Sequence, residues 1–252
     1  MGLFDRSTAT KLSGRTRLLL PDDPGEALLE AVRLYDPEVR RWHGRLVFRN
    51  GVLLFGPIEV TPKLAQQADL PQGMAVAFYT GSAVQPSREE RPHEAKVDDG
   101  DRLVRGLAAR LGGTAQYSGP QTSPALVTSV YSEQAVPADQ VIEVLRPYGG
   151  NFKVEDESED SYSLSGKGTY FYVGYWSPRL YRERTAPPAV GAIRPRPLHH
   201  WDLHAGVSAQ HAARELVRRV GEGTLALASE SNGVAVDVLG FRIGQPDDLL
   251  PA

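Results

Sequence analysis

The chain has 252 residues and a formal net charge of −3, and 23% of its residues are charged. This size allows one large domain or two domains of about 120 residues each. The mildly acidic balance argues against a protein dedicated to duplex nucleic acid, because such proteins usually have a basic face. The sequence contains no cysteine, which excludes disulfides, thiolate zinc sites, iron–sulfur clusters and cysteine nucleophiles.

No apolar run in the sequence approaches the roughly 20 residues of a transmembrane helix. The first eleven residues, MGLFDRSTATK, contain no apolar signal core. The sequence therefore predicts a cytoplasmic protein without a membrane partner.

The first half of the chain predicts short strands and helices in alternation. Residues 1–14 are polar and lack apolar periodicity, so we expect a flexible arm there. The clearest local signal is a hairpin at Arg45–Ile58, because Asn50-Gly51 between two apolar runs is typical of a type I′ turn. Around this hairpin we expect strands at 16–20 and 74–80, a helix at 26–35 and a surface loop at 82–93.

A helix that ends in glycine and leads into a strand occurs twice, at Asp101–Tyr117 and at Gln210–Leu227. Apolar residues recur at helical spacing in both copies. A glycine then favours the left-handed conformation that ends a helix, and a threonine opens the next strand. The repetition predicts a chain built from two similar halves, which we place at 15–118 and 125–252.

The second half repeats the order of the first after a Pro- and Gly-containing linker at 119–124. It predicts strands at 125–131, 152–164, 169–176, 201–204 and 234–238, a helix at 137–145 and a long loop at 177–198. Each half reads as strand, helix, two or three strands, helix and strand, which is the βαββαβ order of ferredoxin-like domains. We therefore expect an α+β fold of two tandem ferredoxin-like halves with antiparallel sheets.

Four of the six histidines lie between residues 199 and 211. Side chains alternate between the two faces of a strand, so His200, Asp202 and His204 share one face. Two imidazoles and a carboxylate are the ligand types of a facial metal site. The alternative is a row of solvated or hydrogen-bonded strand residues beside a Trp201 that is buried in the core.

A flat strand separates residues i and i+4 by about 13 Å, at roughly 3.3 Å per residue. His200, Asp202 and His204 therefore cannot all bind one metal at about 2 Å unless the strand bends. A site built on a pair of them needs ligands from elsewhere, and His93 and His211 are the candidates.

Residues 167–175, KGTYFYVGY, resemble the signature of the RNA recognition motif, in which a basic residue and a glycine precede an aromatic strand that stacks bases. The resemblance implies that Tyr170 and Tyr172 stack on bases and that Lys167 contacts phosphate. The acidic run at 155–160, EDESED, repels phosphate, and aromatic residues are also typical of buried strands. Nucleic acid is therefore the less favoured partner.

The long loop at 177–198 is rich in proline and arginine, and arginine binds carboxylates and phosphates in a bidentate manner. Its candidate binding residues are Arg179, Arg182, Arg184, Arg194 and Arg196. We place this loop at the same position in the second half as the loop at 82–93 in the first. The two loops are therefore expected to frame one binding site.

The sequence has no P-loop, no dinucleotide fingerprint after a strand and no nucleophile elbow. Our leading interpretation is a non-enzymatic binding or assembly protein without a cofactor, which meets a protein partner through these loops. Pairing of exposed sheet edges would make it a homodimer.

Two alternatives belong to other classes. The first is an enzyme whose divalent metal or haem is held by His200 and His204, together with Asp202. Tandem ferredoxin-like chains include the chlorite-dismutase-like haem proteins, which this chain resembles in predicted strand order, and that resemblance implies a haem. The second alternative is a single-stranded nucleic-acid binder that uses Tyr170 and Tyr172.

Overall fold

The computed structural model describes residues 3–82, 93–116, 125–166, 171–180, 186–193, 198–208 and 212–249. The protein is α+β, with two antiparallel six-stranded sheets and, within these ranges, six α-helices. The chain divides into two compact units, Met1–Gln121 and Thr122–Ala252, and each is described by itself. The linker expected at 119–124 lies outside the described residues.

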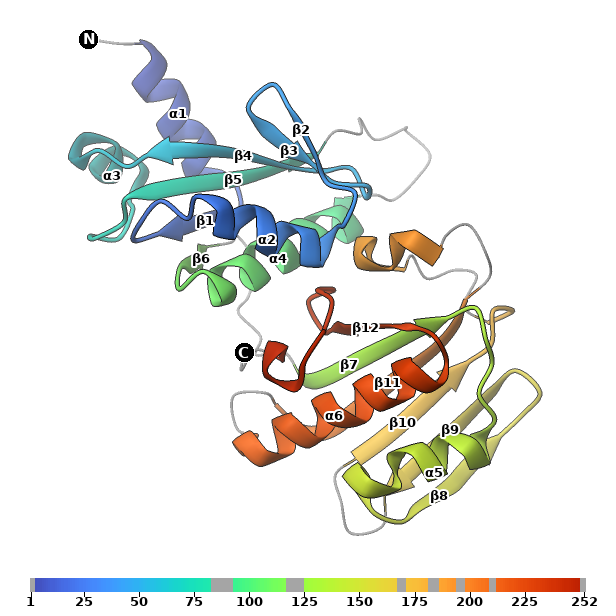
Figure 1. Cartoon of the computed structure of the whole chain (residues 1–252). Coiled ribbons are helices and arrows are strands. Elements are labelled where there is room, and N and C mark those ends of the chain that lie inside the picture. Colours follow the sequence, from blue (N-terminus) through green and yellow to red (C-terminus); the bar gives the residue numbers. More distant parts are fainter. Residues whose placement is uncertain are drawn as a thin grey trace. The chain divides into compact units, whose positions relative to one another are not determined.

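The first unit has four helices and six strands (Figure 1). Its strands are β1 (Arg17–Leu20), β2 (Arg40–Trp42), β3 (Arg45–Val47), β4 (Val52–Glu59), β5 (Val76–Ser82) and β6 (Thr114–Gln116). Its helices are α1 (Leu3–Ser13), α2 (Glu26–Tyr35), α3 (Pro62–Ala68) and α4 (His93–Arg110). The strands form one sheet in the order β2-β3-β4-β5-β1-β6.

The second unit has six strands, two α-helices and two short 3₁₀ helices among its described residues. Its strands are β7 (Ala125–Ser132), β8 (Phe152–Glu157), β9 (Ser161–Gly166), β10 (Phe171–Trp176), β11 (His199–Ser208) and β12 (Val234–Asp237). Its helices are α5 (Ala138–Gly149), α6 (Arg214–Glu230), η2 (Pro188–Ile193) and η4 (Pro246–Asp248). The sheet order is β12-β7-β11-β10-β9-β8.

Both units have the same topology. When strands are numbered from the start of each unit, both sheets run 2-3-4-5-1-6, and all neighbouring strands are antiparallel. One α-helix follows the first strand and another precedes the last strand in each unit. Four strands lie between these two helices, whereas the predicted βαββαβ order has two. Each unit thus contains two strands more than a ferredoxin-like domain.

The last helix and last strand of each unit are joined in the same way. The N–H of Gly113 and the N–H of Gly233 each donate to the carbonyl five residues earlier, at 2.8 and 2.7 Å, which is the closure of a Schellman motif. A Cβ on Gly113 would lie 2.5 Å from the carbonyl oxygen of Leu19 on β1, and one on Gly233 would lie 2.6 Å from that of Tyr131 on β7. Glycine is required because the chain passes directly over the first strand of its unit.

The second of the two predicted helix–strand repeats was placed wrongly. Helix α6 does not end at the glycines after Val220 but continues to Glu230. A Cβ on Gly221 would lie 3.0 Å from the Cα of Pro246, and one on Gly223 would lie 3.3 Å from a methyl group of Leu145 on α5. These two glycines therefore allow close packing against neighbouring elements, and tertiary packing overrides their weak helix propensity.

The expected hairpin at Arg45–Ile58 forms from β3 and β4, but its turn is not type I′. Only Gly51 has a positive φ, of 81°, and its N–H closes a four-residue turn, which is the pattern of a type I turn followed by a left-handed glycine. The type I′ pattern occurs instead at His43 and Gly44, with φ of 46° and 73°, between β2 and β3.

Residues 3–13 form helix α1, so the prediction of a flexible arm at 1–14 was wrong for this segment. Leu12 is fully buried and Ala9 nearly so, and both pack with Leu64 and Ala68 of α3. Two apolar side chains at helical spacing are enough to dock this helix, although they give only a weak periodic signal in the sequence.

The first sheet has helices on both faces. Thr80 of β5 lies against Gly100 of α4 on one face. Side chains alternate between the two faces along the strand, so Ala77 and Tyr79 lie on the opposite face, where they pack with side chains of α1 and α3. Helix α3 belongs to the connection between the fourth and fifth strands and folds back over this second face.

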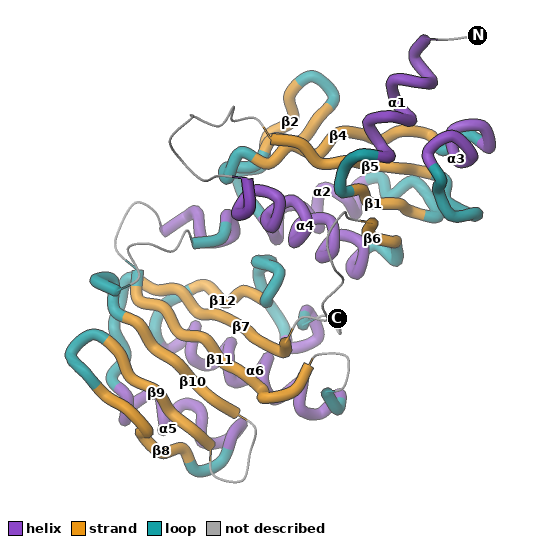
Figure 2. Tube along the Cα trace, turned by 180° about the vertical axis from the view of Figure 1, so that it is seen from behind, coloured by secondary structure: helices purple, strands orange, loops and turns teal. Residues whose placement is uncertain are grey.

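The second sheet has α-helices on one face only. Helices α5 and α6 cover the inner face, where Trp201 and Leu203 of β11 lie in the main core (Figure 1). On the outer face, Ala189 and Val190 of η2 pack on Tyr131 at one end of the sheet. Figure 2 looks onto this outer face, and no other described helix of the second unit covers strands β8 to β11.

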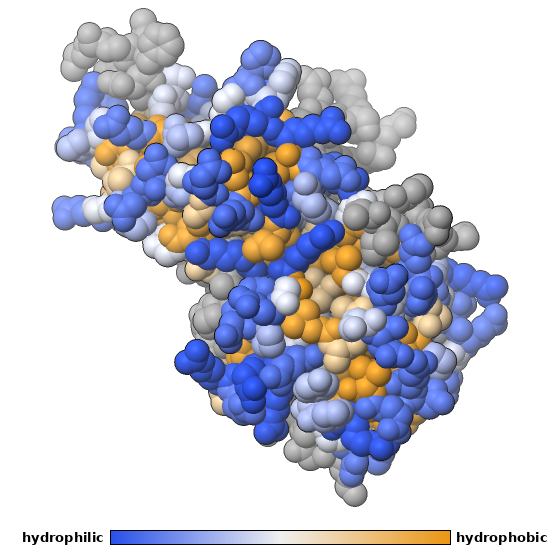
Figure 3. Space-filling view, viewed as in Figure 1, coloured by the Kyte–Doolittle hydropathy of each residue, from blue (hydrophilic) through white to orange (hydrophobic). Residues whose placement is uncertain are grey.

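No helix formed by the described residues is long and apolar enough to cross a membrane. Hydrophilic residues make up most of the surface that is visible in Figure 3.

Candidate functional site

The outer face of the second sheet carries the histidine row that the sequence singled out. Trp201 and Leu203 point into the core, so His200, Asp202 and His204 lie on the outer face, as alternation along β11 predicts. The register places Tyr131 and Ser129 of β7 opposite the first two of them, and Tyr172 of β10 opposite His204.

His200 is enclosed by two aromatic rings. Its imidazole stacks on Tyr131 with ring centroids 4.6 Å apart and on Trp176 with centroids 5.3 Å apart. Only 2% of the residue is exposed, and its Nε2 lies 2.8 Å from Oδ1 of Asp202. The ring therefore joins three neighbouring strands through stacking and one polar contact.

The Asp202 carboxylate is held in its ionised form. Burial acts to raise the pKa of Asp202, but hydrogen bonds from His200 and Ser129 and the charge of the nearby imidazoles outweigh it and lower the pKa. The Ser129 hydroxyl donates to Oδ1 at 2.6 Å. A partly exposed negative charge is thus fixed on the outer face at neutral pH.

The structure brings together only two of the three proposed metal ligands. His200 and Asp202 face each other, whereas His204 lies further along the strand, opposite Tyr172. No group of three or more histidine and acidic residues in the described ranges is arranged to hold a metal ion. His211 and the side chain of His93 lie outside the description. A metal or haem role for these residues stays a prediction.

The inner face of the same strands holds a polar network that sequence reasoning missed. The indole N–H of Trp201 donates to the Tyr162 hydroxyl at 2.8 Å, and that hydroxyl donates to the Val136 carbonyl at 3.0 Å. The Tyr175 hydroxyl and Nδ1 of His199 are 2.8 Å apart, and burial lowers the pKa of His199. These contacts join residues far apart in the chain, so no local pattern indicates them.

Tyr172, the second residue of β10, lies on the outer face with 49% of its surface exposed. Across neighbouring strands, its row consists of His204, Tyr172, Ser165 and Lys153. Tyr170 and Lys167, the other residues of the RNA-recognition resemblance, lie outside the described residues. Strand β10 is the fourth strand of its unit.

The region around Tyr172 is acidic. Within strands β8 to β11 and the turn that joins β8 to β9, Lys153 is the sole lysine or arginine among the described residues. The acidic residues of the same segments are Glu155, Asp156, Glu157, Glu159, Asp160 and Asp202. Glu155 reaches the row of Tyr172 directly, because it accepts a hydrogen bond from the Ser165 hydroxyl. Glu159 and Asp160 pair with Arg179, and Glu157 lies opposite the inward-facing Tyr162. The acidic residues of the outer face are thus Glu155, Asp156 and Asp202, and they favour a positively charged ligand.

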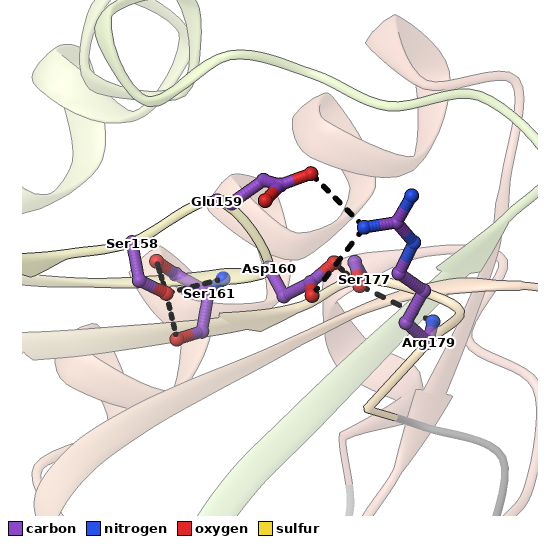
Figure 4. Close-up of polar contacts among 6 residues, drawn as sticks. All are labelled: Ser158, Glu159, Asp160, Ser161, Ser177 and Arg179. Atoms are coloured by element: carbon purple, nitrogen blue, oxygen red, sulfur yellow. Dashed lines mark hydrogen bonds and ion pairs between the residues drawn. The ribbon is translucent and has the colours of Figure 1, made fainter.

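Arg179, one of the proposed loop residues, is already engaged within the unit (Figure 4). Its guanidinium lies 2.9 Å from Glu159 and 4.0 Å from Asp160 in the turn between β8 and β9. The Ser177 hydroxyl also donates to Asp160, at 2.6 Å. The other four proposed arginines, Arg182, Arg184, Arg194 and Arg196, lie outside the described residues.

The two long loops do not occupy equivalent places in the topology. The loop at 82–93 lies between strand β5 and helix α4, the fifth strand and the last helix of the first unit. The loop at 177–198 instead joins β10 to β11, the fourth and fifth strands of the second unit. The counterpart of 177–198 in the first unit is therefore the connection that contains α3. The expected equivalence of the two loops was wrong because the sequence analysis missed strand β2 in the first half. That the two loops frame one binding site stays a prediction.

The first unit has a basic edge that sequence reasoning also missed. Edge strand β2 is fully exposed and reads Arg40-Arg41-Trp42. The Arg45 guanidinium lies 4.1 Å from the centroid of Trp42 and 5.6 Å from that of Phe55, so it is held between the two rings. In the sequence, only the glycine of His43-Gly44 hints at a turn after this strand. In the structure, the φ values of these two residues show the type I′ pattern.

Comparisons of the chain with protein-family models, with curated proteins and with solved structures found no match.

Proposed function

We propose that this chain is a binding protein that receives a positively charged segment of a partner protein on the outer face of its second sheet. The observation that carries the proposal is the exposed ring of Tyr172 on a sheet face that carries Glu155, Asp156 and Asp202 and that no described helix of the second unit covers there.

The chemistry of the face suits an arginine or lysine side chain. A cation over an exposed tyrosine ring contributes about 0.5–1 kcal/mol. Asp202 supplies a carboxylate whose pKa is lowered. Glu155 accepts a hydrogen bond from Ser165, a member of the Tyr172 row. For a guanidinium stacked on Tyr172, the candidate acceptors are Asp202 on the neighbouring strand β11 and Glu155 on β8, which is separated from β10 by β9.

The first unit provides an internal comparison. Its equivalent sheet face is occupied by α1 and α3, and its row equivalent to Tyr131, His200 and Trp176 contains Leu19, Ala77 and Ile58. The same topology thus carries an apolar, covered row in one unit and a polar, aromatic one in the other. A polar outer face in the second unit is consistent with a surface kept for binding.

Single-stranded nucleic acid is the main competitor for the same ring, since bases also stack on exposed tyrosine. The acidic residues around Tyr172 favour a cationic peptide over a phosphate backbone. The two ligands are therefore compared in one experiment.

The test is calorimetric titration of the whole protein with short arginine-containing peptides and with matched peptides that have glutamine in place of arginine. We expect binding that requires arginine and weakens with salt. Tyr172→Ala should lower affinity roughly two- to fivefold, about 0.5–1 kcal/mol, and Glu155→Gln should lower it as well.

Leu180→Ala is the matched control, because Leu180 is another exposed large side chain of the same unit. It should leave peptide affinity unchanged. Binding of oligouridylate that is lost in Tyr172→Ala, without binding of any arginine peptide, would overturn the proposal in favour of nucleic acid.

A further inference from the structure

Two edge strands of this chain carry opposite charges. β2 ends the first sheet and β8 ends the second sheet. An edge strand exposes backbone N–H and C=O groups on its free side and can pair with another chain. The charges of its side chains then decide which partner strand can pair with it.

The basic edge is β2. Arg40 and Arg41 are exposed and form no ion pair with any residue that the structure describes. Trp42 follows them with 55% of its surface exposed. Its ring is fixed by the Arg45 guanidinium at 4.1 Å, and the two-residue turn at His43-Gly44 holds the hairpin rigidly. The edge therefore presents two cations beside one ordered apolar ring.

The acidic edge is β8. Asp156 and Glu157 are exposed, and neither forms an ion pair within the described part of the chain. Val154 lies on the same strand with 43% of its surface exposed. The strand also carries Lys153 and Glu155, so it has three acidic residues and one lysine and is acidic overall. Its charge is the complement of that of β2.

The charges restrict how these edges can pair. Contact between two β2 strands places arginines against arginines, and contact between two β8 strands places carboxylates against carboxylates. Only β2 against β8 brings opposite charges together. Like charges on edges prevent unwanted pairing, so of the three pairings possible between these two edges the charges disfavour two and favour β2 against β8.

We propose that two copies of this chain associate by docking the β2 edge of one copy against the β8 edge of the other. The partner is a second copy because every chain carries one basic edge and one acidic edge, so any two copies present complementary edges to each other. The interface is heterologous, since the two contacting surfaces differ. Arg40 and Arg41 face Asp156 and Glu157 across it, and Trp42 gains apolar contact.

The test is sedimentation velocity of the whole protein over a range of concentrations at low and high salt. We expect self-association that weakens as salt rises. Arg40→Glu/Arg41→Glu and, separately, Asp156→Arg/Glu157→Arg should each give a monomer. Circular dichroism checks that both variants are folded.

The decisive sample is an equimolar mixture of the two variants. The reversed β2 of one variant is then complementary to the reversed β8 of the other, so the mixture should associate although neither variant does alone. Arg33→Glu/Arg214→Glu changes the charge equally at exposed positions away from both edges and should associate like the unmodified protein.

The proposal is overturned if the unmodified protein is monomeric at low salt throughout the concentration range. It is equally overturned if the mixture stays monomeric, or if either variant associates alone. The result is independent of peptide binding, because Tyr172→Ala should leave self-association intact and Arg40→Glu/Arg41→Glu should leave peptide affinity intact.

Discussion

Among single residues, buried polar side chains connect segments that are far apart in the sequence, including strands β9 and β11 on either side of β10. The Tyr162 hydroxyl accepts from the Trp201 indole and donates to the Val136 carbonyl, and all three groups are buried. A buried polar group that loses its partner costs more than the bond itself contributes.

Tyr162→Phe should therefore lower the free energy of unfolding by about 1–3 kcal/mol, because it leaves the Trp201 N–H and the Val136 carbonyl unpaired. Urea unfolding followed by circular dichroism measures the change. Tyr172→Phe removes the same atom from an exposed ring and should change the free energy by less than about 0.5 kcal/mol. Equal effects of the two substitutions would contradict the buried network.

His199 predicts a dependence of stability on pH. Burial lowers its pKa in the folded state, so the unfolded state takes up the proton first as pH falls. Neutral His199 therefore contributes to stability above the unfolded-state pKa of about 6.5. This contribution to the free energy of unfolding is lost as pH falls from there toward the folded-state pKa.

His199→Asn should consequently reduce the loss of unfolding free energy between about pH 7.5 and about pH 5.5 relative to the unmodified protein. Urea titrations at the two pH values measure this difference. An unchanged difference would show that His199 is not protected from protonation in the folded state.

Sequence reasoning reached part of the site at this scale. The shared face of His200, Asp202 and His204 and the burial of Trp201 follow from alternation along one strand, which is local. The contacts of Asp202 with Ser129 and of His200 with Tyr131 depend on how β7 pairs with β11. Non-local register of this kind leaves no signal in a single sequence.

At the scale of elements, glycines serve two purposes that look alike in the sequence. Gly113 and Gly233 pass over the first strand of each unit, whereas Gly223 lies inside α6 against a flexible leucine side chain. The sequence analysis read the glycines inside α6 as its end, because a helix interior and a helix cap share the same residue type. Only the packing partner distinguishes the two uses.

Gly233→Ala should destabilise the protein by about 1–3 kcal/mol, because its Cβ would lie 2.6 Å from a backbone oxygen that cannot easily move. Gly113→Ala should have a similar effect through the first unit. Gly223→Ala should instead be neutral or stabilising by up to about 1 kcal/mol, because alanine is the better helix former. Thermal unfolding of the three variants measures the order, and a reversed order would contradict the repeat described here.

At the scale of the whole molecule, one topology occurs twice with different surfaces. The core clusters described for the second unit draw only on residues after 125, and the cluster under α1 and α3 draws only on the first unit. The repeat was predictable from the sequence because helices and caps recur. Strand β2 was not predictable, since it has only three residues and carries no periodic signal.

A fragment of residues 122–252 should therefore fold by itself and show one cooperative thermal transition. Circular dichroism and the dispersion of its amide NMR spectrum measure this. A fragment with exposed apolar surface and no cooperative transition would show that its core is incomplete without the first unit.

An amide NMR titration of the whole protein with an arginine-containing peptide tests whether the outer face of the second sheet binds cations. We expect chemical-shift changes that centre on Tyr172, His204 and Ser165 and leave the inner-face helices α5 and α6 unaffected. Changes confined to the first unit, or no changes at peptide concentrations that saturate calorimetric binding, would contradict a binding role for the outer face of the second sheet.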